Sequence, residues 1–129
     1  MAGGGGGGGG VSVNCLLVMS LLLLSSINLI AGHTYIVGGD AGWSYNINWP
    51  QPGQTFVEGG TLVFNYPPGE HNVAEVDVEG YSTCEAPPGS NVYSSGEDHV
   101  KLRRGDNYFI CGVGSHCRDA GMRIVVTAE

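Results

Sequence analysis

The chain has 129 residues and a formal net charge of -7, from twelve acidic and five basic side chains. This length suits a single domain of common size, and the acidic charge argues against a nucleic-acid or anionic-membrane partner. All the charged side chains lie after residue 32, so the chain divides there into an uncharged part and an acidic part.

The first 32 residues are typical of a secretory signal peptide with a glycine-rich start. A run of glycines precedes an apolar stretch that ends at the small residues Ala31 and Gly32. The segment has no Lys or Arg, which is irregular for a signal peptide. Its strongest apolar run, Leu16 to Leu24, is shorter than the roughly 20 residues of a membrane span, which favours cleavage over a retained signal anchor.

We therefore expect residues 1–32 to be a signal peptide and residues 33–129 to form one secreted, extracellular domain. The later sequence has no second apolar segment, and the chain ends V-V-T-A-E, without a lipid-anchor signal. No stable membrane anchor is expected, and we expect the domain to be a monomer.

Short β-rich runs separated by turns predict an all-β domain. Helical periodicity is absent from windows of about a dozen residues unless they include Gly or Pro. The expected strands are residues 34–37, 54–57, 61–66, 71–78, 99–102, 107–111 and 122–127. Turns rich in Gly, Pro and Ser separate them about every ten residues, which predicts an antiparallel sandwich or barrel of two sheets. The irregular segment 43–49 is expected to be a loop or a single helical turn.

Three cysteines follow residue 32: Cys84, Cys111 and Cys117. In an oxidising compartment an odd number leaves one thiol unpaired, bonded to another chain or bound to something else. A disulfide between Cys84 and Cys117 is the simplest arrangement if Cys111 binds a metal. The other two pairings stay open.

The stretch C-G-V-G-S-H-C-R-D-A-G-M, residues 111–122, is the strongest indication of chemistry. In a sandwich, strands that end at one pole can bring His71 to Cys111, His116 and Met122 of this stretch. Two imidazoles, a thiolate and a weak axial thioether are the ligands of a type 1, or blue, copper site. Soft sulfur favours Cu(I) and imidazole serves both oxidation states, so we predict one copper ion bound by these four side chains.

A structural zinc site of two cysteines and two histidines is an alternative. Structural zinc sites usually use short paired spacings such as C-x2-C, and this chain has none. In an extended chain the adjacent side chains of His116 and Cys117 point to opposite faces, so both are not expected to bind one ion.

Several motifs in order resemble the phytocyanins, plant blue copper proteins of cupredoxin fold, and among them the plantacyanin group. They are V-G-G-D-A-G-W, F-N-Y followed by H-N-V, Y-S-T-C, and N-Y-F-I-C-G-V-G-S-H-C followed by G-M. The resemblance extends from Tyr35 to Thr127. It implies a Greek-key sandwich of about seven to eight strands in two sheets.

The resemblance also implies roles for individual residues. His71, Cys111 and His116 would form the copper plane, Met122 would be axial, and Cys84 would pair with Cys117. The protein would be an electron carrier of the apoplast or cell wall and not an enzyme. Its redox partner, a protein or a small molecule, is unidentified, and His116 is the expected exit point for the electron.

Three features differ from the family pattern. The segment between His116 and Met122 is one residue longer than usual, Gly114-Ser115 replaces the common Pro-Gly pair, and the domain is acidic. The extra residue either forms a loop at residues 118–120 or moves Met122 away from the metal.

The longer segment also supports an alternative function of another class. This is a copper-free module of the same fold, acting in the cell wall or in signalling.

Overall fold

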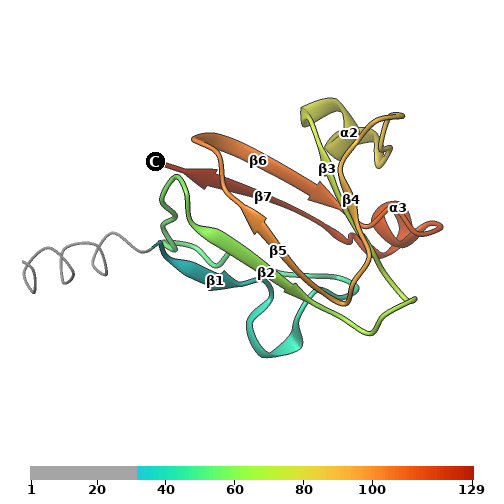
Figure 1. Ribbon diagram of the computed structural model, residues 1–129. Helices are drawn as coiled ribbons and strands as arrows, with labels where there is room; N and C mark the ends of the chain where they lie inside the picture. The colour runs from blue at the N-terminus through green and yellow to red at the C-terminus, as the bar shows by residue number, and fades with distance from the viewer. Residues whose placement is uncertain (1–31) are drawn as a thin grey trace, which may run out of the picture. The chain divides into compact units, whose positions relative to one another are not determined.

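The computed structural model describes residues 32–129. The predicted signal peptide, apart from Gly32, lies outside the described residues. Within them, none of the helices has the length and apolar character required to span a membrane. Seven strands in this part of the chain form two sheets, as Figure 1 shows.

The first sheet has three strands in the order β1-β2-β5. They are β1 (Thr34–Ile36), β2 (Thr61–Asn65) and β5 (Glu97–Lys101). β2 is antiparallel to β5, but β1 is parallel to β2, which differs from the predicted antiparallel arrangement. The connection from β1 to β2 is long enough for the crossover that parallel neighbours require.

The second sheet has four antiparallel strands in the order β4-β3-β6-β7. They are β3 (Val73–Val76), β4 (Val92–Tyr93), β6 (Gly105–Ile110) and β7 (Arg123–Ala128). The chain crosses between the sheets after β2, after β4 and after β5, as expected for Greek-key connectivity. The predicted all-β sandwich is therefore confirmed.

One predicted strand is absent, and one observed strand was not predicted. Residues 54–57 form no strand, and Phe56 makes only an isolated bridge to Ala128. Turn residues on both sides, P-G before and E-G-G after, leave too short an extended segment for a ladder. The short strand β4 was not predicted, because two residues carry no recognisable alternation.

Short helices also interrupt the predicted pattern: η1 (Gly39–Ala41), α2 (Val78–Thr83) and α3 (His116–Ala120). The predicted strand 71–78 ends early, because β3 stops at Val76 and Asp77 caps α2. The Asp77 carboxylate accepts a hydrogen bond from the Gly80 N–H at 2.9 Å. Helices of one or two turns are too short to show a periodic apolar face. The segment 43–49 is irregular, as expected.

α3 accommodates the longer segment after His116 as a helical turn instead of the expected loop. It ends at Gly121, whose φ of 58° is the left-handed conformation common after a helix. The Met122 N–H then donates to the His116 carbonyl at 3.1 Å. Figure 1 shows α2 and α3 at the end of the sandwich where β6 finishes.

The core fills the space between the two sheets. Trp43 and Phe64 are completely or almost completely buried, and their rings meet edge to face at 5.2 Å. The side chains of β7 alternate, and those of Ile124, Val126 and Ala128 are buried. Cys111 and Met122 belong to the same buried cluster, so sulfur donors lie within the core.

A disulfide joins Cys84, which follows α2, to Cys117 in α3. This is the predicted pairing. Cys117 is 3% exposed and packs with Ala74 and Ile110, in a small cluster separate from the main core. The bridge therefore fastens the helix that carries His116 to the end of α2.

The buried pair of Tyr66 and Asp98 gives a prediction of how stability changes at alkaline pH. Asp98 is 6% exposed and accepts hydrogen bonds from the Ser95 N–H and the Tyr66 hydroxyl. Burial, and then the bond to Asp98, raise the pKa of Tyr66 to about 12. The unfolded chain releases this proton near pH 10, so the folded state holds the proton between these values and loses stability as the pH rises.

We expect the Tyr66 titration to lower the free energy of unfolding by about 2 to 3 kcal/mol between roughly pH 10 and 12. Urea unfolding of the native protein and of Tyr66→Phe across this range measures the effect. Because other tyrosines titrate in both proteins, the difference between the two is the relevant quantity. The stability advantage of the native protein should shrink by that amount, and a constant difference would contradict the prediction.

Candidate metal centre

Three of the predicted donors meet at one point in the structure. The Nδ1 atoms of His71 and His116 are 3.1 Å apart. The Sγ of Cys111 lies 3.9 Å from His71 Nδ1 and 3.6 Å from His116 Nδ1. In residues 32–129 this is the only group of three or more His, Cys, Asp or Glu donors close enough to hold one ion.

The pairing of β3 with β6 explains how distant residues come together. His71 lies just before β3, and Cys111 directly follows β6. The two strands are antiparallel neighbours, with Ala74 opposite Ile110. The start of β3 and the end of β6 therefore lie at the same edge of the sheet, and the short 112–115 turn brings His116 back to that edge.

Backbone hydrogen bonds hold Met122 beside the donor cluster. The Cys111 N–H donates to the Met122 carbonyl at 3.0 Å, and the Met122 N–H donates to the His116 carbonyl at 3.1 Å. The Met122 side chain is 0% exposed and packs in the cluster that contains Cys111. The longer segment after His116 thus keeps Met122 next to the donors.

The spacing of the three donors fits a transition-metal ion. Zinc binds His nitrogen at about 2.0 Å and Cys sulfur at about 2.3 Å, so a trigonal ion of this size separates sulfur from nitrogen by roughly 3.7 Å and the nitrogens by roughly 3.5 Å. The observed sulfur–nitrogen distances are 3.6 and 3.9 Å, and the nitrogens are 3.1 Å apart. Only small shifts separate this arrangement from a bound one.

The protonation of His71 also suits metal binding. His71 is 4% exposed. Burial lowers the pKa of His71, the nearby His116 acts in the same direction, and Glu70 opposes them. At neutral pH His71 is therefore an uncharged imidazole, the form that binds metals.

The alternative zinc site of two cysteines and two histidines was wrong, because Cys84 and Cys117 are joined to each other. The expectation that His116 and Cys117 lie in extended chain was also wrong. The pair lies at the start of α3, not in extended chain. Successive side chains on a helix point about 100° apart, which still directs them to different surroundings.

Asn72, which sequence reasoning did not single out, links the donor segments. Its Oδ1 accepts a hydrogen bond from the Gly112 N–H at 2.6 Å. Its carbonyl accepts one from Trp43 Nε1 at 2.9 Å. Because Asn72 follows His71 and Gly112 follows Cys111, the Asn72–Gly112 hydrogen bond holds these two donors at a fixed distance from each other. The only available signal was its position next to a candidate ligand.

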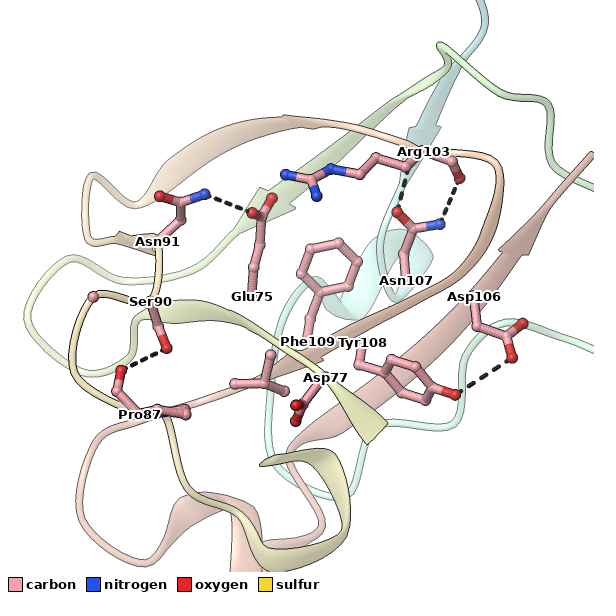
Figure 2. A pocket seen from close by; sticks show the side chains of 12 residues that line it. Glu75, Asp77, Pro87, Ser90, Asn91, Arg103, Asp106, Asn107, Tyr108 and Phe109 are labelled. Atoms are coloured by element: carbon pink, nitrogen blue, oxygen red, sulfur yellow. Dashed lines mark hydrogen bonds between the residues drawn. The ribbon is translucent and has the colours of Figure 1, made fainter. Parts of the chain in front are cut away.

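An open pocket of about 340 Å³ lies elsewhere, between β3, β6 and the 87–91 turn, and Figure 2 shows it. None of the clustered donors lines it. Its polar side chains are largely paired with one another: Asn91 donates to Glu75 at 3.0 Å, and the Tyr108 hydroxyl to Asp106 at 3.3 Å. Among the described residues, no buried side-chain N or O atom lacks a hydrogen-bond partner. The buried polar groups of this region are therefore all paired within the protein.

The sequence is similar to those of known plastocyanin-like and blue proteins. A family model described as a plastocyanin-like domain matches residues 41–122. The chain is 48% identical over 95 residues to the basic blue protein of Cucumis sativus, covering 73% of this chain and 97% of that protein. It is 50% identical over 95 residues to the chemocyanin of Lilium longiflorum, covering 73% of this chain and 74% of that protein.

A solved structure extends the similarity to the fold. Cucumber basic protein, a blue copper protein, matches with a TM-score of 0.70 at 47% identity, covering 74% of this chain and 99% of that one. This match confirms the predicted cupredoxin-like sandwich. On its sequence, its fold and its relatives, the chain belongs to the plastocyanin-like family and, within it, to the phytocyanins that its motifs resemble.

Proposed function

We propose that this protein is a secreted type 1 copper protein that carries single electrons. The observation that carries the proposal is the cluster of two imidazole nitrogens and one thiol sulfur, all within 4.8 Å of one another. The cucumber structure is titled a blue copper protein and the Cucumis sativus relative is named a basic blue protein, and neither name denotes an enzyme. His71, Cys111 and His116 would hold the ion in a plane, and Met122 would be the weak axial ligand.

Copper, when bound, supplies a one-electron Cu(II)/Cu(I) couple. The residues around it supply rigidity: Asn72 ties the His71 segment to the Cys111 segment, and the backbone of Met122 binds both Cys111 and His116. The core excludes water from Cys111, which is 1% exposed. Donors held in this way move little when an electron arrives, and this favours fast transfer.

The predicted signal peptide supports secretion, and a protein or small molecule would be the redox partner. The net charge of -7 favours a partner with positive charge at short range. His116 is half-buried at the edge of the site, whereas His71 and Cys111 are enclosed. The electron would therefore leave on the side of His116.

Reconstitution with copper tests the proposal. We expect one copper per chain and an intense visible band from thiolate-to-copper charge transfer. Cys111→Ser should remove the band, because its hydroxyl cannot replace the thiolate. Met122→Gln should keep a band but change its spectrum if Met122 is axial. A colourless copper complex of the native protein would overturn the proposal.

The copper-free module makes a different prediction for protein taken from its native compartment. Metal analysis of such material should find copper if the electron-carrier proposal holds, and no metal if the alternative holds. The complete donor set favours copper.

A further inference from the structure

Tyr45 lies directly over the two histidines of the metal centre. Its ring stands edge to face against His71 at 4.8 Å and against His116 at 4.9 Å, measured between ring centroids. Its hydroxyl is 3.3 Å from His116 Nε2. The side chain is 47% exposed, unusual for a large ring with so many contacts. Tyr45 therefore forms the outermost layer at this edge of the site.

The loop that carries Tyr45 is held at both ends. On one side, the Trp43 N–H donates to the Asn65 carbonyl at 2.9 Å, and the Trp43 ring is buried in the core. On the other side, the Asn46 N–H donates to the Ala120 carbonyl at 2.6 Å. Ala120 is the last residue of α3, the helix that begins with His116. The position of Tyr45 is thus set by the core and by the same helix that carries the ligand.

This arrangement also gives a role to the longer segment after His116. Ala120 belongs to the R-D-A sequence that contains the extra position. The helical turn formed there presents the carbonyl that anchors Asn46. The departure from the usual family length and the placement of Tyr45 are therefore linked by a direct hydrogen bond.

The two nitrogens of His116 face different surroundings. Nδ1 points into the cluster, 3.6 Å from Cys111 Sγ. Nε2 points away from it and meets the Tyr45 hydroxyl. A molecule approaching the site from solvent on this side meets Tyr45 before it reaches the imidazole.

We propose that Tyr45 is a positioning residue that covers the metal centre and restricts the access of small molecules to His116 and to the ion. The part that concerns the ion rests on the proposed function, whereas the covering of His116 does not. A redox partner would then dock against the phenol ring and not against a bare imidazole. The proposed role of Tyr45 is steric, so its phenol is neither oxidised nor deprotonated.

The first test uses the full-length protein without metal. Diethyl pyrocarbonate modifies accessible imidazoles, and mass spectrometry gives the rate at each histidine. If the cover is open about a tenth of the time, Tyr45→Ala should speed modification of His116 about tenfold. Tyr45→Phe keeps the ring and should stay within about threefold of the native rate. His33 and His99, which are exposed and outside the cluster, are internal controls.

A rate at His116 that changes less than about twofold in Tyr45→Ala would overturn the cover, since the ring would then shield nothing. Urea unfolding of each variant checks that the fold is retained. Equal acceleration at His33 and His99 would also contradict the proposal, because it would show general loosening of the domain.

The second test uses copper-loaded protein and azide as a small probe ligand. Tyr45→Ala should bind azide about tenfold more tightly than the native protein, with a change in the visible spectrum, and Tyr45→Phe should resemble the native protein. Equal azide affinities in an intact blue protein would refute the shielding of the ion. Absence of the blue band from the native protein would instead refute the proposed function and leave the histidine-labelling result unaffected.

Discussion

Replacing both Cys84 and Cys117 by alanine is expected to lower the free energy of unfolding by about 4 kcal/mol. The two cysteines are 33 residues apart in the sequence, and closing a loop of this length restricts the unfolded chain. Small domains have a total stability of about 5 to 15 kcal/mol, so the loss is a large part of it. Urea unfolding with the full baseline on both sides measures the change.

Reduced native protein is the control, because it lacks the bridge but keeps both side chains. Alanine is preferred to serine since Cys117 is buried among apolar groups. Below its unfolding transition the double variant should still form the blue copper site, because neither cysteine is a donor. A loss below about 1 kcal/mol would contradict the stabilising role, and loss of the band in a folded variant would contradict the ligand assignment.

Trp43→Ala is expected to destabilise the protein by about 3 to 5 kcal/mol, the usual cost of removing a large buried aromatic ring. The Trp43 ring is 1% exposed and packs edge to face on Phe64. Its Nε1–H also donates to the Asn72 carbonyl at 2.9 Å. The substitution therefore removes core packing together with a support for the segment that carries His71.

Trp43→Phe and Trp49→Ala separate these contributions. Trp43→Phe keeps a ring in the core but lacks the indole N–H, so we expect a smaller loss that includes about 1 kcal/mol for the hydrogen bond. Trp49 is only half-buried, and its removal should cost less than that of Trp43. Thermal or urea unfolding of the three variants ranks them, and an equal cost for Trp43→Ala and Trp49→Ala would contradict the prediction.

Much of the fold was predictable from local pattern. Short β-rich runs bounded by turns predicted β7 at residues 122–127 and β2 in the T-L-V-F-N-Y run. Buried residues alternate in β7, whereas three successive residues of β2 are buried. The helices α2 and α3 left no comparable pattern. Their clearest signals are single residues, the capping Asp77 and the terminal Gly121.

The identity of the candidate donors was also predictable, since imidazole, thiol and thioether have a recognisable chemistry. Their roles at the ion remain a proposal. The supporting residues were not predictable, because Asn72 and Tyr45 act through contacts with residues far away in the chain. The parallel pairing of β1 with β2 was not predictable either, since it depends on a long connection and not on either strand alone.

The sequence by itself determined the chemistry of this protein and the class of its fold. Residue types set which groups can bind a metal, and short-range patterns set which segments extend. Only the tertiary structure brought His71 to Cys111 and His116, joined Cys84 to Cys117, and set the Tyr45 ring against both histidines. These are long-range contacts, and they form because two sheets bury their apolar faces against each other, an arrangement that no local stretch of sequence specifies.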